Sequence, residues 1–287
     1  MLASRLKSHI KHARDQIVGR VKIGPRKYRI RGYLPSHLAV RTEWEPHVSL
    51  AISAILQKRK GVFIDIGANV GQTLFTVLRA DPDRSYLGFE PQIACCHYLQ
   101  QFIQDNGLMP RVQIFPVALS SENGFFSLFS NNPYDDCATL MSDVHQLNNT
   151  QLVCARNGDE VLAELGVSAI SAIKIDVEGA ELSVLTGLQN TLRKIRPPVI
   201  FEVLPNFRGR LRRDESVCAR KSAEADKIHE LLSSMGYALF QIDQPSRTLV
   251  PIKRFDLDGK GTLPGRDYVA LEKADHFIFG PTAETAR

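Results

Sequence analysis

The sequence lacks the features that mark membrane-spanning, secreted and disulfide-stabilised proteins. It has no apolar run close to the roughly 18 residues that a membrane-spanning helix needs. Its N-terminus is basic and contains no apolar core of a secretory signal. Its five cysteines are odd in number, and none stands in C-x-x-C spacing. We therefore predict a cytoplasmic protein with reduced thiols and no transmembrane segment.

Neither sign of charge dominates the chain. The 36 Lys and Arg residues exceed the 31 Asp and Glu residues only slightly, which gives a formal net charge of +5. This mild excess predicts no nucleic-acid partner. Apolar residues make up 44% of the 287 positions, which is typical of a folded protein with one large domain and extensions.

One stretch, residues 61–72, reads GVFIDIGANVGQ and organises the rest of the sequence. Its first half is a short apolar run that predicts a buried strand. Gly67, Asn69 and Gly71 then predict a tight turn, and a helical pattern follows. A helix that begins at such a turn presents backbone N–H groups, which bind the anionic end of a small molecule.

The next predicted strand, residues 85–90, ends in Glu90. A carboxylate at this distance from the turn is suited to bind a ribose diol. The turn itself does not match the G-x-G-x-x-G fingerprint of dinucleotide-binding folds, because its small residues alternate as D-x-G-x-N-x-G. The pattern therefore favours an adenosine-type cofactor over a bound pyrophosphate.

Predicted strands and helices alternate from residue 61 onward, which indicates an α/β fold with a doubly wound, mostly parallel sheet. Two further strands are predicted at residues 169–177 and 199–203. The carboxyl ends of parallel strands meet at one edge of a sheet, where ligands bind. The acidic residues expected at that edge are Asp65, Glu90, Asp176, Glu178 and Glu202.

We predict an N-terminal extension of helix, hairpin and helix over residues 1–60, a main domain over 61–273 and a tail over 274–287. Residues 1–20 place apolar side chains at helical spacing among basic ones. Two interpretations stay open for them: weak contact with a membrane surface, or packing on this domain or on a second copy in a homo-oligomer.

Two other segments are predicted to border the ligand site. Residues 130–157 are polar and irregular, which is typical of a functional lid. Residues 208–213 are rich in arginine and follow a strand of the site. They are interpreted either as a contact for an acidic or phosphorylated glycan or as a solvated loop.

Five segments together resemble the FkbM-type methyltransferases that depend on S-adenosylmethionine. They are FIDIGANVGQT (63–73), GFEP (88–91), VALS (117–120), IKIDVEGAE (173–181) and DYVALEK (267–273). The resemblance implies a seven-stranded, Rossmann-like sheet with one antiparallel strand, and S-adenosylmethionine as the methyl donor. It also implies O-methylation of a small-molecule or glycan acceptor in sugar, polysaccharide or natural-product pathways. One departure is Gln72, where the family often carries an aromatic residue.

The resemblance assigns the cofactor to the loops that follow the first two strands. The turn of residues 67–71 would hold the methionine end, Thr73 its carboxylate, and Asp65 would orient the turn or the amino group. Glu90 would accept both ribose hydroxyls, and Asp176 would face the sulfonium. The full set of implied cofactor residues is Asp65, Gly67, Ala68, Asn69, Gly71, Thr73, Glu90, Pro91, Ala118 and Asp176.

A sugar hydroxyl is a poor nucleophile at neutral pH, so its methylation calls for a general base or a metal ion. The candidate bases are Glu178, Glu202 and His145. Each has a structural alternative: Glu178 as a helix cap, Glu202 in a buried hydrogen bond, and His145 as an ordinary loop residue.

The acidic residues could also gather Mg²⁺, but their spacing does not require it, and we predict no metal. Three other functions stay open beside O-methylation. They are N-methylation of an amine, cofactor binding without catalysis, and, less favoured, a nicotinamide-dependent oxidation.

Overall fold

The structure, a computed structural model, describes most of the chain. The described residues are 18–31, 45–132, 134–135, 137–140, 149–208, 211–212, 214–244, 246–258, 266–273 and 275. Residues 1–17 of the helix predicted within residues 1–20 lie outside them, as do His145 and nearly all of the predicted tail. Residues 18–20 form the start of a strand, so the helix prediction is wrong there. The predicted division into extension, domain and tail remains a prediction.

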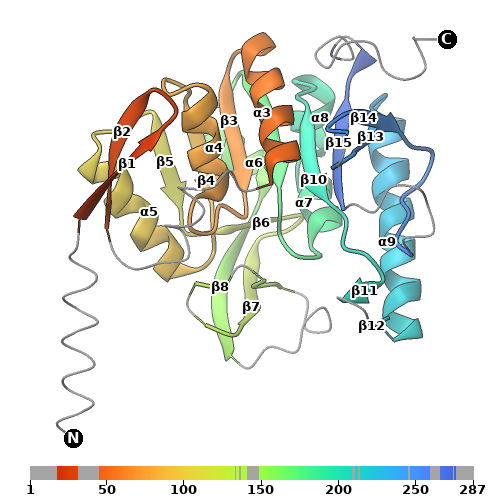
Figure 1. Cartoon of the computed structure of the whole chain (residues 1–287). Coiled ribbons are helices and arrows are strands. Elements are labelled where there is room, and N and C mark those ends of the chain that lie inside the picture. Colours follow the sequence, from red (N-terminus) through yellow and green to blue (C-terminus); the bar gives the residue numbers. More distant parts are fainter. Residues whose placement is uncertain are drawn as a thin grey trace, which may run out of the picture.

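A mixed sheet of eight strands forms the centre of the molecule (Figure 1). In spatial order the strands are β14 (Leu249–Pro251), β13 (Ala238–Ile242), β15 (Asp267–Leu271), β10 (Val199–Glu202), β9 (Ile170–Ile175), β3 (Val62–Ile66), β4 (Tyr86–Phe89) and β5 (Val112–Phe115). The five strands from β10 to β5 are parallel. β15 runs antiparallel to both β10 and β13.

The predicted count of seven strands is wrong because β14 adds an eighth. It pairs antiparallel with β13 at the sheet edge. Three residues that end in Pro251 show no alternating pattern, and proline is tolerated on an edge strand because its missing N–H faces away from the sheet.

A second sheet lies beyond the carboxyl ends of the parallel strands (Figure 1). It contains β6 (Ala118–Ser120), β8 (Asn149–Asn157) and β7 (Gly124–Ser130), in that order. Residues 112–120 thus form two strands in two different sheets, which divide at Pro116. The predicted loop over residues 130–157 is also shorter than expected, because residues 149–155 of β8 pair with the whole of β7.

Helices cover both faces of the main sheet. On one face, α3 (Pro46–Lys58), α4 (Gln72–Ala80) and α5 (Ile93–Asp105) share a core with the hairpin of β1 (Val18–Ile23) and β2 (Arg26–Arg31). On the other lie α6 (Gly158–Glu164), α7 (Glu181–Gly187), α8 (Gln189–Lys194) and α9 (Glu215–Ser234). A short hairpin, β11 (Phe207–Arg208) and β12 (Leu211–Arg212), precedes α9.

Among the helices that the structure describes, none has the length and apolar character needed to cross a membrane. All five cysteines are free thiols.

The ends of β3, β4 and β9 approach one another closely at Gly67. Its N–H donates to the carbonyl of Phe89 at 2.9 Å, and the N–H of Asp176 donates to the carbonyl of Ile66 at 2.9 Å. Gly67 has φ of 89°, and a Cβ at this position would lie 1.8 Å from the carbonyl oxygen of Asp176. Only glycine allows the turn to leave β3 here.

We expect Gly67→Ala to lower the free energy of unfolding by about 3 kcal/mol or more, because strain at positive φ adds to a backbone clash. Gly107→Ala is the matched control, since Gly107 has φ of 60° and open space around it. The control should lose only about 1 kcal/mol. Urea unfolding measures both; equal losses would contradict the close approach.

Candidate functional site

A cavity of about 430 Å³ opens at the carboxyl edge of the parallel strands. Its wall includes the turn after β3, the end of β4, the second sheet, the ends of β9 and β10 and the start of α3. The predicted site residues that line it are Gly67, Asn69, Thr73, Glu90, Pro91, Ala118, Asp176, Glu178 and Glu202. Three others, Asp65, Ala68 and Gly71, are buried but are not part of this lining.

Glu90 is held in a fixed orientation by the two loops beside it. Its Oε2 accepts the backbone N–H of Asn69 at 2.8 Å, and its Oε1 accepts that of Gln92 at 2.7 Å. Each carboxylate oxygen has a second lone-pair site, so the group can still accept two further hydrogen bonds. Burial raises the pKa of Glu90 to about 7, although the two backbone donors oppose this rise.

Asp65 lies behind the turn and not on the cavity surface. It is fully buried, and the hydroxyl of Tyr86 donates a short hydrogen bond to its Oδ2. Burial raises its pKa to about 6, against the opposing effects of the Lys174 ammonium and the Tyr86 hydroxyl. Asp65 therefore supports the turn from the sheet side.

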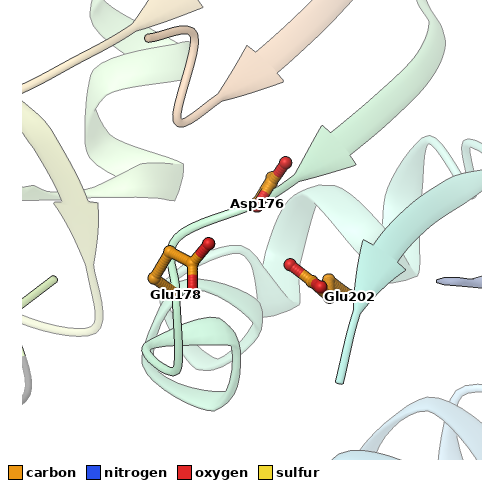
Figure 2. A group of neighbouring side chains, drawn as sticks. All are labelled: Asp176, Glu178 and Glu202. Atoms are coloured by element: carbon orange, nitrogen blue, oxygen red, sulfur yellow. The ribbon is translucent and has the colours of Figure 1, made fainter. Parts of the chain in front are cut away.

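Three carboxyl groups converge at the other end of the cavity (Figure 2). Asp176 and Glu178 follow β9, and Glu202 ends β10. One oxygen from each lies within 4.8 Å of the others. Lys174 Nζ lies 2.6 Å from Asp176 Oδ2 and neutralises part of this charge. The Arg266 guanidinium contacts Glu202.

The three acids differ in how they hold protons. Burial and the neighbouring charge of Asp176 raise the pKa of Glu202 to about 10, so Glu202 is protonated at neutral pH. Burial by itself would raise the pKa of Asp176. The Lys174 ammonium and a hydrogen bond from Glu202 act in the opposite direction, and together they hold the pKa of Asp176 below its usual value. Asp176 and Glu202 thus form a pair with one proton, and Glu178 stands beside it.

Glu178 does not cap the following helix, so that alternative is wrong. α7 begins at Glu181, and no side chain caps its first turn. Instead Glu181 accepts the N–H groups of Gly179 at 3.1 Å and Val177 at 3.4 Å. This holds the turn that presents Glu178, which has φ of 53°. Glu181 is buried, and burial raises its pKa to about 7.

The described part of the predicted lid connects both ends of the cavity. The carbonyl of Asp135 accepts from Asn69 Nδ2 at 3.0 Å and from Gln92 Nε2 at 2.8 Å. The hydroxyl of Thr139 donates to the carbonyl of Glu178 at 2.8 Å. These bonds place residues 137–140 in the cavity wall.

Four charged residues of the cavity were not predicted as site residues: Glu45, Asp135, Lys174 and Arg266. Glu45 precedes α3, and burial raises its pKa. Next to it, His47 Nε2 lies 2.7 Å from Asp267 Oδ2, which fixes α3 against β15. Lys174 had a signal in the sequence, because it is the one charge inside the apolar run of residues 169–175. Glu45 and Arg266 had none.

Comparison with known proteins identifies relatives of the chain. Residues 65–239 match the family model of the methyltransferase FkbM domain. The chain is 28% identical over 159 residues to the 2-O-methyltransferase NoeI of Sinorhizobium fredii. This alignment covers 50% of this chain and 64% of that protein. It is 25% identical over 167 residues to the methyltransferase sdnD of Sordaria araneosa, 48% of this chain and 64% of that protein. Both alignments span less than two thirds of the relative.

A solved structure, the methyltransferase FkbM from Methylobacillus flagellatus KT, aligns with a TM-score of 0.45 at 16% identity. The alignment covers 74% of this chain and 43% of that one.

The raised pKa values predict how stability depends on pH. Folded Asp65, Glu90 and Glu181 have pKa values of about 6, about 7 and about 7, above the roughly 4 of an unfolded chain. At pH values between about 4 and about 7, the folded state therefore binds more protons than the unfolded state. The stabilisation from these protons is present at low pH and is lost as the pH rises through the folded pKa values.

We expect the free energy of unfolding, without ligand, to be about 2 kcal/mol or more higher at about pH 5.5 than at about pH 8. Urea unfolding at a series of pH values measures this. Glu181→Gln keeps the acceptor oxygen and should flatten part of the slope. A stability that increases from pH 5.5 to pH 8 would contradict the assignment.

Proposed function

Because the chain belongs to the FkbM methyltransferase family, we propose that it uses S-adenosylmethionine to methylate a hydroxyl group of a sugar, polysaccharide or natural-product acceptor. One observation carries the proposal. One cavity contains both Glu90, whose two oxygens are oriented by backbone donors, and a group of three carboxyls. The family match and the name of NoeI as a 2-O-methyltransferase support it.

The residues of the cavity fit the cofactor. Glu90 would bind the ribose hydroxyls, and the turn of residues 67–71 would hold the methionine end, with Asp65 as its support from behind. Asp176 and Glu178 bring negative charge to the part of the cavity where a sulfonium would be stabilised. When bound, S-adenosylmethionine supplies a methyl group on a sulfonium that is already activated for displacement.

The protein then has two tasks, which are to position the acceptor hydroxyl and to take its proton. Glu202 cannot take the proton at neutral pH, because it already carries one. Asp176 is held by Lys174 and by that protonated carboxyl. We assign the base to Glu178, which lines the cavity beside this pair. His145 lies outside the described residues and remains the less favoured candidate.

No metal ion is part of this proposal. Oxygen ligands suit Mg²⁺, and the three carboxyls are close enough to share an ion. However, the ammonium of Lys174 and the guanidinium of Arg266 already pair with two of them, and Glu202 holds a proton. An entering cation would have to displace these partners.

N-methylation is the second candidate function, because an amine acceptor would be attracted by the same carboxyls and needs a weaker base. Cofactor binding without methyl transfer is the third. The polar residues at both ends of the cavity favour catalysis over this third function.

The cofactor assignment is tested by calorimetric titration with S-adenosylhomocysteine. We expect Glu90→Gln to weaken binding by at least about tenfold, because glutamine offers one acceptor oxygen where the site uses two. Binding to the unaltered protein should also weaken below about pH 7, as Glu90 takes up a proton. The exposed Glu122→Gln is the control. Binding of NAD in place of the sulfur ligand would overturn the proposal.

The base is tested by the transfer of a labelled methyl group from S-adenosylmethionine to a panel of methyl glycosides. We expect Glu178→Gln to lower kcat by about 10²–10⁴-fold with little change in S-adenosylhomocysteine affinity. Glu202→Gln is the matched control and should lose at most about tenfold, since glutamine also donates to Asp176. EDTA should leave the activity unchanged. Equal losses in both variants would refute the assignment to Glu178.

A further inference from the structure

The hairpin of β1 and β2 is attached to the body by two of its six cationic residues. Arg26 pairs with Asp83 at 2.8 Å, and Arg31 contacts both oxygens of Asp105 at 2.5 and 2.7 Å. The backbone N–H and carbonyl of Arg29 both bond to the side chain of Asn106. The hairpin therefore lies in a fixed position beside α5 (Figure 1).

The inward face of the hairpin is apolar. Ile23, Tyr28 and Ile30 are buried in the core that it shares with α4 and α5. Because side chains alternate along a strand, the intervening residues must point away from the body. This outward side, defined by Arg20, Lys22, Lys27 and Arg29, is the basic face of the hairpin; all four are exposed.

The basic face concentrates like charges. Arg20 stands directly opposite Arg29, and Lys22 stands directly opposite Lys27. Like charges in such pairs destabilise a sheet. Among the described residues, no carboxylate forms an ion pair with any of the four. The nearby Asp105 is already bound by Arg31.

The six cations of the hairpin fall into two groups that differ in their partners. Arg26 and Arg31, which attach the hairpin to the body, each pair with a carboxylate, whereas no described carboxylate forms an ion pair with the four outward cations, which repel one another across the strands. Folding alone does not require four cations here, since any polar side chain would solvate this face. The arrangement is suited to an extended anionic surface.

We propose that the basic face binds the anionic headgroups of a phospholipid bilayer. The hairpin has no exposed aromatic side chain, so its basic face lacks the aromatic stacking platform of single-strand nucleic-acid sites. Basic residues close to an anionic bilayer are attracted to it without inserting.

The sequence that leads into the hairpin supports a lipid partner. Residues 1–17, whose structure is not described, place apolar residues among basic ones, a composition that suits an anionic lipid surface. The apolar residues are Leu2, Leu6, Ile10 and Ile17, and the basic ones are Arg5, Lys7, Lys11 and Arg14.

The proposal is tested with the full chain by co-sedimentation with vesicles of phosphatidylcholine alone or with about one third phosphatidylserine. We expect binding only to the anionic vesicles, and weaker binding as salt is added. Arg20→Gln, Lys22→Gln, Lys27→Gln and Arg29→Gln in one variant should lower the partition coefficient by at least about a hundredfold, since each cation contributes about fivefold.

The matched control removes the same charge elsewhere, with Arg193→Gln, Lys194→Gln, Lys253→Gln and Arg254→Gln at exposed positions. It should change the partition coefficient by less than about threefold. Circular dichroism checks that both variants fold, and the pairs Arg20/Arg29 and Lys22/Lys27 can be replaced separately if the fourfold variant does not.

Three results would overturn the proposal. They are no binding of the unaltered chain to anionic vesicles, binding that persists in the hairpin variant, and equal losses in the hairpin variant and the control. Binding of RNA or DNA through the basic face, without binding to the vesicles, would assign the face to a nucleic acid instead.

Discussion

Burial of carboxyl groups is the constraint on which the cavity depends. An acid removed from water must find donors, a cation or a proton, and each acid of this site does so differently. Glu90 has two backbone donors, Asp65 has the Tyr86 hydroxyl, and Asp176 has Lys174. Glu202 keeps its proton. The result is a cavity whose acids differ in function because their surroundings differ.

The same constraint explains why Glu181 matters although it does not line the cavity. Its buried carboxyl is the acceptor for the turn between β9 and α7. Glu178 and Gly179 both have positive φ, so this segment departs from regular structure, and the N–H groups of Val177 and Gly179 find their acceptor in Glu181. Glu181 thus fixes the turn that presents Glu178, the proposed base.

The sequence was sufficient to predict those parts of the site that follow strand periodicity. Glu90, Asp176 and Glu202 each stand at or just beyond the end of an apolar strand, and the structure brings all three to one cavity. Lys174 was missed although its charge interrupts an apolar run. Glu45 and Arg266 could not be predicted, because long-range packing brings them to the cavity and no local motif surrounds them.

The contact between His47 and Asp267 has a consequence for the order in which the cavity is assembled. The two residues are 220 positions apart, whereas Asn69 and Glu90 are 21 apart. Closing the longer loop costs about 2 kcal/mol more chain entropy. During synthesis, the end of the cavity around Glu90 can form from a continuous stretch of chain, while the end around Glu45 and Arg266 must wait for β15. The half of the cavity around Glu90 can therefore form before the half around Glu45 and Arg266.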